Sequence, residues 1–385
     1  MRNRIIRTAE SVTEGHPDKL CDIIADSILD ACLRRDPNAR VACEVMATAG
    51  KVIVAGEITA CEMPDIPYIV CSTIKHIGYD VLDYEVEIRI HDQSEDIAKA
   101  VGRRGNGAIA LGAGDQGIVY GYATNETKHM LPLPVVLAHR ITRLLTAARR
   151  LGTVPGLLPD GKAQVSVEYA YGVPCRASCI VLSAQHMEDV HIPSFRRRLM
   201  EHVVVPALAK LSFDEKDVLI NPSERFVLGG FEADTGLTGR KLMADTYGGI
   251  VPHGGGALSG KDATKVDRSG AYMARYIAKN IVAARLAEEC TVSLAYAIGK
   301  PEPVAVHVDA HGTGKYEDAF LKRAALSLFD VTPSGIIRTF KLTEPIFAQT
   351  AYHGHFMENT FPWEQVDKAD ALQGFAKRGT ADWKS

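Results

Sequence analysis

A helical segment followed directly by two strand-like runs is the feature that most constrains how this chain can fold. Apolar residues recur every three or four positions over residues 20–33, which predicts a helix. The runs 41–48 and 52–59 are strand-like, and only Ala49 and Gly50 separate them. A connection of two residues predicts an antiparallel hairpin rather than a strand–helix–strand unit.

The register of this hairpin would bring two acidic side chains together. If its loop has two residues, opposing positions add to an odd number, and Glu44 and Glu57 then lie on one face of the sheet. Two like charges so placed repel each other unless a cation or a polar ligand accompanies them. The pattern therefore predicts either a cation-binding face or a solvated face.

The rest of the chain mixes helical and strand-like segments without the strict alternation of a doubly wound fold. We expect strands over 164–169, 179–183 and 304–308, and helices over about 195–211 and 271–286. A length of 385 residues favours two or three domains. The fold class predicted is therefore α+β.

Charge and hydropathy exclude several classes of partner. Lysine and arginine total 44 against 47 aspartates and glutamates, a net charge of −3, so a general nucleic-acid binder is not expected. No apolar run approaches the roughly 18 residues of a membrane helix, and the N-terminus has no signal-peptide core. We expect a cytoplasmic protein with no nucleic-acid partner and no membrane partner.

The first glycine-rich stretch resembles a dinucleotide motif but has the wrong context. Residues 112–117 read Gly-Ala-Gly-Asp-Gln-Gly and fit the GxGxxG pattern. That pattern needs a helix immediately afterwards, so that the pyrophosphate meets the helix N-terminus. The residues that follow, 118–122, are strand-like instead. A dehydrogenase is therefore not predicted.

The second glycine-rich stretch, 255–261, fits the GxxxxGK part of a P-loop. Asp262 stands where serine or threonine would hold Mg²⁺, so an ordinary P-loop is not expected. Clustered glycines nevertheless expose backbone N–H groups, and Lys261 and Lys265 add positive charge. The stretch is either a phosphate-binding loop or a glycine-rich surface turn.

Other basic residues lie beside glycines or at a helix start. His16 and Lys19 flank a predicted helix N-terminus, Asp160-Gly161-Lys162 has the composition of a turn, and Arg240-Lys241 follows Gly239. Singly, each is typical of an ordinary helix start, turn or solvated pair. Together with the second glycine-rich stretch, such spots in an acidic chain predict one polyphosphate site.

These residues also resemble a known family. Residues 112–122, GAGDQGIVYGY, are similar to the first signature of the S-adenosylmethionine synthetases, and residues 254–262, GGGALSGKD, to their second signature. Further motifs match in family order: GHPDK at 15–19, ACE at 42–44, GEIT at 56–59, INP at 220–222, GLTGRK at 236–241, KVDRS at 265–269 and FPWE at 361–364. The resemblance runs from about residue 11 to 368. Leu258 departs from it, since the second signature usually has phenylalanine there.

The resemblance implies three similar α+β domains in a pseudo-threefold arrangement, with helices covering the sheets. The expected boundaries are an N-terminal domain at 1–98, a lid or linker at 99–108, a central domain at 109–228 and a C-terminal domain at 229–385. It also implies a tight homodimer with sites between the subunits, paired into a homotetramer. The activity implied is attack of the methionine sulfur on C5′ of ATP, followed by hydrolysis of the released tripolyphosphate to pyrophosphate and phosphate.

The resemblance assigns a role to each matching residue. The expected phosphate-contacting and catalytic residues are His16, Lys162, Arg240, Lys241 and Lys261. The other expected ATP ligands are Asp160, Arg225, Phe226, Asp234 and Ala257, with Phe226 stacking on adenine. The expected methionine ligands are Glu57, Gln93, Asp115, Asp234 and Lys265. The expected metal ligands are Asp18 and Asp267 for Mg²⁺, two ions per site, and Glu44 for K⁺.

The implied chemistry suits these residue types. A thioether sulfur carries no proton, so the reaction needs no general base, whereas a polyphosphate leaving group needs preorganised cations. Two alternatives stay open on the sequence alone. One is a non-catalytic regulatory homologue of the same fold, and the other is a different Mg-ATP-dependent phosphotransferase, which would release ADP.

Overall fold

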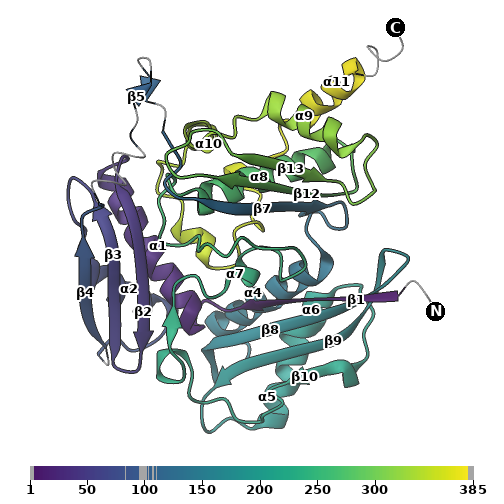
Figure 1. The fold of residues 1–385 in the computed structure, drawn as a ribbon. Helices are drawn as coiled ribbons and strands as arrows, with labels where there is room; N and C mark the ends of the chain where they lie inside the picture. The colour runs from purple at the N-terminus through teal and green to yellow at the C-terminus, as the bar shows by residue number, and fades with distance from the viewer. Residues whose placement is uncertain are drawn as a thin grey trace.

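Three larger β-sheets organise the described part of the chain, and each has a long helix against one face (Figure 1). The computed structural model describes residues 4–82, 84–94, 102, 104–105, 108–109 and 111–379. Of the expected lid or linker, 99–108, only residues 102, 104–105 and 108 fall within these ranges. Each larger sheet is packed against helices, and this mixture of helices and strands confirms the α+β class.

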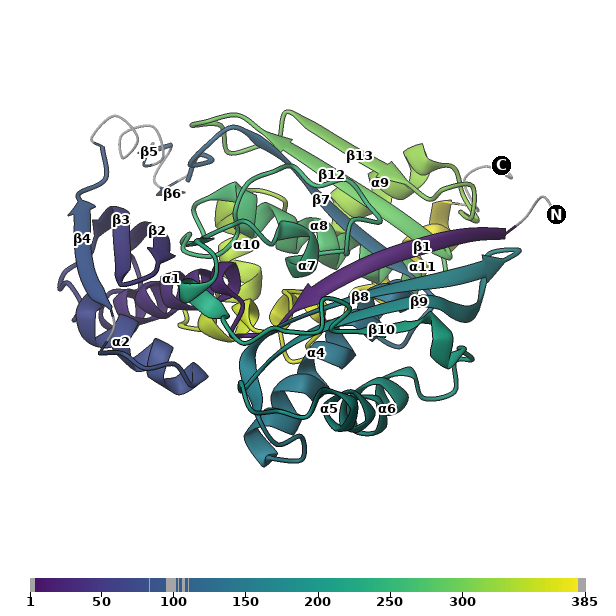
Figure 2. The same cartoon turned by 90° about the horizontal axis from the view of Figure 1, so that it is seen from below.

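The first sheet has the order β1-β8-β9-β10, and helix α4 packs on it with α5 and α6 on the same side (Figure 2). Its strands are β1 Arg4–Val12, β8 Leu157–Ala170, β9 Val173–His186 and β10 Val218–Ile220. Its helices are α4 Leu133–Leu151, α5 Ile192–Leu199 and α6 Val205–Leu208. β1 and β8 run antiparallel, so the N-terminal strand is built into a sheet whose other strands come from the middle of the chain.

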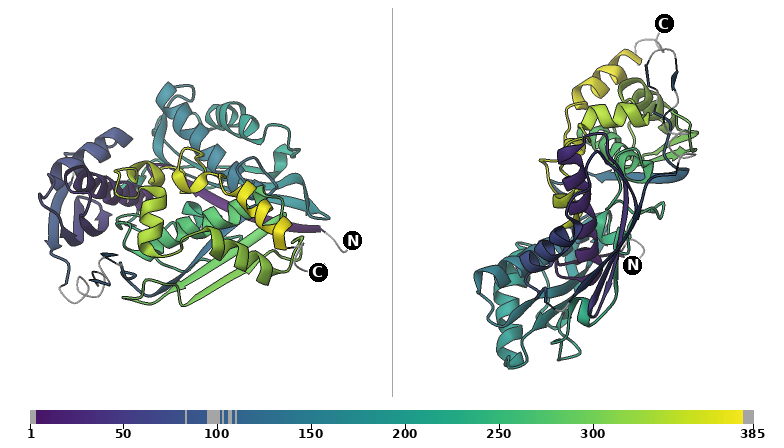
Figure 3. Two further views of the ribbon diagram at one scale, coloured as in Figure 1. Left: turned by 90° about the horizontal axis from the view of Figure 1, so that it is seen from above. Right: turned by 90° about the vertical axis from the view of Figure 1, so that its left-hand side faces the viewer.

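The second sheet has the order β11-β2-β3-β4 and packs on α1, the purple helix beside the strands in Figure 3 (right). Its elements are α1 Pro17–Arg35, β2 Arg40–Thr48, β3 Lys51–Thr59, α2 Ile66–Ile77, β4 Glu85–His91 and β11 Gly236–Leu237. Thr48 faces Lys51 across a two-residue turn, and Glu44 faces Ala55. The predicted helix, hairpin and shared face of Glu44 and Glu57 are thereby confirmed.

The third sheet has the order β13-β12-β7 and packs on α8. Its elements, with the helices that follow, are β7 Gly117–Thr124, α8 Val266–Ala283, β12 Glu289–Tyr296, β13 Ala305–Asp309, α9 Asp318–Leu328, α10 Pro333–Phe340 and α11 Ala369–Gly379. The short elements are β5 Arg104–Gly105, β6 Ala108–Ile109 and α7 Leu242–Asp245. A strand follows the first glycine-rich stretch, as predicted, which excludes the dinucleotide fold.

The sheets do not follow the sequence segment by segment. β11 pairs with β2 although it lies about 190 residues further along the chain, and β7 pairs with β12. Each larger sheet therefore contains strands from more than one expected domain, and the domain boundaries stay a prediction. Among the described helices, none is both long and apolar enough to cross a bilayer.

One local prediction was wrong. Asp160-Gly161-Lys162, expected as a turn, lies inside β8. The glycine serves close packing there, since a Cβ at Gly161 would lie 2.7 Å from Leu145 Cδ2 and 3.0 Å from the Ser183 carbonyl oxygen.

The helix expected over about 195–211 is confirmed as a helical segment over 192–208, with different ends. It contains a π-helical turn, Met200–Val204, just before Pro206, which has no N–H to donate in an ordinary helical turn.

Candidate functional site

A first group of expected site residues gathers at the N-terminus of α1. His16 caps this helix, and its Nδ1 accepts a hydrogen bond from the Asp18 N–H at 3.2 Å. An accepting Nδ1 carries no hydrogen, so the neutral ring has its hydrogen on Nε2. Burial, with the charges of Lys241 and Lys162, lowers the pKa of His16 to about 3. His16 is therefore an uncharged donor at neutral pH.

Asp18 connects this helix start to the basic loop that follows β11. Its side chain is buried and accepts the Leu237 N–H at 3.0 Å and the Lys241 ammonium at 2.6 Å. Arg240 Nε lies 3.7 Å from the same carboxylate. Burial alone would raise the pKa of Asp18, but the hydrogen bond and charge of Lys241 outweigh it and hold that pKa below its usual value.

Strand β8 brings the next two expected residues to the same place. Val12 at the end of β1 faces Lys162 in the antiparallel register, so the loop leading to His16 begins beside Lys162. Lys162 pairs with Glu10 at 2.9 Å. Asp160 is buried and accepts the Gly230 N–H at 2.9 Å.

The carboxyl of Asp160 lies in an acidic neighbourhood. Burial raises its pKa to about 6, and the charges of Asp234 and Asp18 add to this shift. Residues from β8, from the start of α1 and from the segment before β11 therefore lie near one another.

A second group forms around the second glycine-rich stretch. Lys261 pairs with Asp267 at 2.6 Å, and Lys265 pairs with the buried Asp262. A Cβ at Gly256 would lie 2.3 Å from Asp267 Cγ, so only glycine allows this approach. The predicted cationic loop therefore has a defined conformation, held by two ion pairs, and is not a solvated turn.

Strand β2 places this loop next to the acidic face of the hairpin. The Cys43 N–H donates to the Gly260 carbonyl at 2.9 Å, and the Asp262 N–H donates to the Val41 carbonyl at 3.0 Å. Glu44 is exposed on this face, with Lys261 as a nearby cation and Asp22 and Glu57 as nearby acids. A carboxylate on a face with other acids gains from a bound cation.

The two groups touch through Gly239. Its N–H donates to Asp22 at 2.9 Å, and a Cβ at this position would lie 2.5 Å from Ala257 Cβ. The loop that carries Arg240 and Lys241 therefore lies against the second glycine-rich stretch. One chain brings together the α1 N-terminus, β8, the loop after β11 and the glycine-rich stretch.

Several other expected ligands of ATP and methionine lie less close to these two groups. Arg225 is exposed and pairs with Glu188 at 2.7 Å, while Phe226 is half-buried. Glu57 lies 3.7 Å from His91, and the Gln93 N–H donates to Thr59 Oγ1 at 3.0 Å. Those expected methionine ligands lie on or just after the second sheet.

Asp115 stands apart from that group. It is exposed, and its carboxylate accepts the N–H of the neighbouring Gln116 at 2.7 Å. The N–H of the preceding Gly114 donates to the Thr264 carbonyl at 3.2 Å, so the loop that carries Asp115 lies against the segment that carries Lys265, another expected methionine ligand.

The donor set can be tested for its fit to metals. Among the described residues, no three His, Cys, Asp or Glu side chains converge as a complete metal cage. Mg²⁺ does not need such a cage, because it is commonly held by one or two carboxylates together with substrate phosphates and waters. Asp18 and Asp267, each set beside a lysine that could contact phosphate, fit that mode.

Sequence reasoning missed Asp22 and Asp245, which hold the basic loop in place, and it was wrong to expect the Lys19 ammonium at an anion site, because Lys19 is buried and paired with both aspartates. Asp22 is fully buried, pairs with buried Lys19 at 2.9 Å and accepts the Gly239 N–H, while Lys19 also pairs with Asp245. The spacing offered a signal, since Asp22 lies four residues after Asp18 and therefore on the same helix face. Its partner on the loop could not be read from the sequence.

Comparison with known proteins gives one consistent result. The chain matches three family models: the N-terminal domain of S-adenosylmethionine synthetase over residues 4–102, the central domain over 110–226 and the C-terminal domain over 228–365. It is 48% identical over 386 aligned residues to the S-adenosylmethionine synthase of Sulfurovum sp. (strain NBC37-1). That alignment covers 97% of this chain and 99% of the relative.

Proposed function

Because the chain belongs to the S-adenosylmethionine synthetase family, we propose that its two charged groups form the site in which it makes S-adenosylmethionine. The chain is a methionine adenosyltransferase, an enzyme of S-adenosylmethionine biosynthesis. The observation that supports the site is the convergence of Arg240 and Lys241 on the buried Asp18, with His16 at the same helix start and Lys162 close enough to lower the pKa of His16.

We propose that these cations bind the triphosphate of ATP. Lys162, Arg240, Lys241 and Lys261 would contact phosphate oxygens, and the neutral His16 would donate from Nε2. The methionine sulfur attacks C5′, and negative charge then grows on the tripolyphosphate as the C5′–O bond breaks. Donors already aimed at that oxygen lower the barrier because they need little reorganisation. The same residues would hold the tripolyphosphate for its hydrolysis to pyrophosphate and phosphate.

Asp18 and Asp267 are the proposed Mg²⁺ ligands, with two ions per site, and Glu44 is the proposed K⁺ ligand. Bound Mg²⁺ would neutralise charge on the phosphates. Each of these aspartates pairs with a lysine in the structure, so a lysine and a carboxylate can together receive a metal-bound phosphate. The acidic face of the hairpin supports the K⁺ assignment, since Glu44 and Glu57 share that face and a cation would offset their like charges.

The substrates would lie on either side of the phosphate site. Asp160, Asp234, Ala257, Arg225 and Phe226 are the proposed nucleoside ligands, with Phe226 stacking on adenine. Glu57, Gln93, Asp115, Asp234 and Lys265 are the proposed methionine ligands. Carboxylates among them would attract the methionine ammonium, and Asp115 would stabilise the sulfonium as it forms.

We also propose that the enzyme is a cytoplasmic homodimer, paired into a homotetramer, with sites shared between subunits. The exposure of Asp115 supports a shared site, since its carboxylate is open to a second chain. A subunit-swapping experiment tests this proposal. Mixing inactive Asp115→Asn and Lys162→Met chains should restore activity only if one site takes residues from two chains.

Product analysis tests the proposed reaction. With ATP, L-methionine, Mg²⁺ and K⁺, we expect S-adenosylmethionine together with phosphate and pyrophosphate in equal amounts. ADP as the product would indicate a phosphotransferase, and the absence of turnover would indicate a non-catalytic homologue. Omitting K⁺ or Mg²⁺ in parallel reactions tests each metal, and activity that is independent of Mg²⁺ would contradict its assignment.

A further inference from the structure

Two buried polar residues at the end of β9, Gln185 and His186, contact the segment that carries Phe226. Their exposed fractions are 5% and 2%. None of the motifs discussed above includes them, and neither is a proposed substrate ligand. A buried amide and a buried imidazole need hydrogen-bond partners, and here the partners identify what the two side chains do.

His186 holds the backbone of Phe226 from both sides. The His186 N–H donates to the Phe226 carbonyl at 2.8 Å, and the Phe226 N–H donates to His186 Nε2 at 3.1 Å. His186 Nδ1 lies 2.8 Å from the Met187 carbonyl, which can only accept, so the ring hydrogen is on Nδ1. The ring therefore fixes the Phe226 N–H, and the backbone N–H of His186 fixes the Phe226 carbonyl.

Gln185 joins the same segment to Asp160. Its Oε1 accepts the Asp160 N–H at 3.1 Å, and its Nε2 donates to the Val227 carbonyl at 3.0 Å. Gly229 packs directly on this amide, because a Cβ there would lie 2.4 Å from Gln185 Cδ. Asp160 in turn accepts the Gly230 N–H. Gln185 therefore supports both the segment that carries Phe226 and the proposed nucleoside ligand Asp160.

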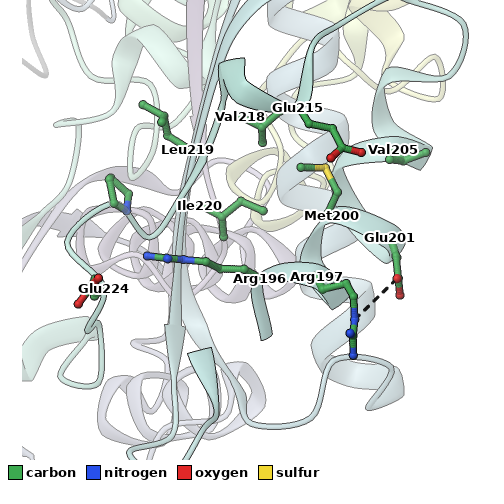
Figure 4. A pocket seen from close by; sticks show the side chains of 11 residues that line it. Arg196, Arg197, Met200, Glu201, Val205, Glu215, Val218, Leu219, Ile220 and Glu224 are labelled. Atoms are coloured by element: carbon green, nitrogen blue, oxygen red, sulfur yellow. Dashed lines mark ion pairs between the residues drawn. The ribbon is translucent and has the colours of Figure 1, made fainter. Parts of the chain in front are cut away.

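The start of the segment is anchored separately. Asn221 bonds through its side chain to the N–H and the carbonyl of Ala184, at 2.7 and 2.9 Å. Arg196 donates to the Asn221 carbonyl at 2.6 Å. Figure 4 shows Arg196 reaching from its helix toward the chain between Ile220 and Glu224, along a cavity of about 740 Å³. Residues 223–229 form no helix or strand, so the backbone and side-chain hydrogen bonds from the end of β9 hold Phe226 in place.

We propose that Gln185 and His186 are positioning residues that set the Phe226 ring for stacking on adenine. This inference rests on the proposed function, in which Phe226 stacks on the base. Among the described contacts, neither side chain bonds to a proposed phosphate-binding residue, and the Gln185 bond to the Asp160 backbone reaches a proposed nucleoside ligand. Their loss should therefore affect the binding of the nucleoside and spare the binding of the phosphates.

Three variants test the role of His186. His186→Leu removes both ring nitrogens, His186→Gln keeps an oxygen that can accept the Phe226 N–H, and His202→Leu is a matched control at an exposed position. Base–aromatic stacking is strong enough that we expect His186→Leu to raise KM for ATP about tenfold, with a smaller rise for His186→Gln. KM for methionine, and inhibition by inorganic tripolyphosphate, should stay within about twofold of wild type, as should every constant of His202→Leu.

A double-mutant cycle tests whether His186 acts through Phe226. Phe226→Leu removes the stacking ring, so adding His186→Leu to it should raise KM for ATP no further. Equal and additive effects would overturn the inference, as would a His186→Leu variant that loses tripolyphosphate inhibition to the same degree as ATP binding. Gln185→Leu provides an independent arm if His186→Leu does not fold, and it should show the same selective effect.

Measurements on the wild type distinguish a failure of the positioning role from a failure of the proposed function. An active wild type, inhibited by tripolyphosphate, together with an unselective His186→Leu would overturn the positioning role alone. A wild type that neither turns over nor binds tripolyphosphate would overturn the proposed function and this inference with it.

Discussion

Replacing Asp26 should destabilise the protein strongly, because Asp26 is the only carboxylate bonded to the buried guanidinium of Arg268 among the described residues. Both side chains are fully buried, and their two N···O distances are 2.7 and 2.8 Å. Asp26 also accepts the Gly260 N–H at 2.8 Å. The pair therefore joins α1 and α8 to the second glycine-rich stretch.

The magnitude follows from what Asp26→Leu leaves behind. Removing one partner of a buried pair costs about 3–5 kcal/mol, since the remaining charge has no counter-ion. The orphaned Gly260 N–H adds roughly 1–3 kcal/mol. These terms overlap, so we expect the free energy of unfolding to fall by about 5 kcal/mol, and turnover to fall with it because Lys261 follows Gly260.

Urea unfolding followed by far-UV circular dichroism, at one protein concentration, measures this change. Glu62→Gln is the matched control, since it removes a charge from the exposed pair with Arg35 and should cost no more than about 1 kcal/mol. The double variant Asp26→Leu/Arg268→Met removes both charges of this buried pair, so most of the lost stability should return. A loss below about 1 kcal/mol in Asp26→Leu, or a double variant no more stable than the single one, would refute this reasoning.

Three further predictions concern the site and the packing. Lys162→Met and Arg240→Leu should each lower kcat by roughly 100-fold or more with an almost unchanged thermal midpoint, whereas Lys210→Met on the surface should be neutral; near-wild-type turnover would contradict the assignment. Because burial and Lys241 lower the pKa of His16 to about 3, an NMR titration from pH 8 to pH 5 should find its ring uncharged with the hydrogen on Nε2, and a midpoint near 6.5 would contradict this. Burial raises the pKa of Asp160 to about 6, so the folded state binds more protons than the unfolded state between about pH 4 and 6. In that range the free energy of unfolding should fall with rising pH more steeply in wild type than in Asp160→Asn. Equal slopes in the two proteins would contradict this prediction.

Features that depend on neighbouring residues could be predicted well. The helix after His16 and the hairpin over 41–59 are confirmed, including the register that puts Glu44 and Glu57 on one face. Apolar spacing and a two-residue turn are local signals, so they survive without knowledge of the tertiary structure. The strand after the first glycine-rich stretch was predicted on the same basis.

Features that depend on distant contacts were missed or wrong. The composition of Asp160-Gly161-Lys162 indicates a turn, but β1 and β9 pair on either side of this segment and make it a strand. Gln185 and His186 carry no local signal, because their importance lies in hydrogen bonds to residues about 40 positions away. Buried polar side chains can be recognised only when their partners are known.

By itself the sequence determined the α+β class, the family and the residue types of the site, because ordered motifs and local periodicity are written in consecutive residues. Only the tertiary structure decided that His16 and Lys241 meet at one buried carboxylate with Lys162 near His16, and that His16 is an uncharged donor there. The reason is that long-range strand pairing sets which segments meet, and burial beside other charges sets each proton's affinity. Neither the strand pairing nor the burial of a charge is a property of any short stretch of chain.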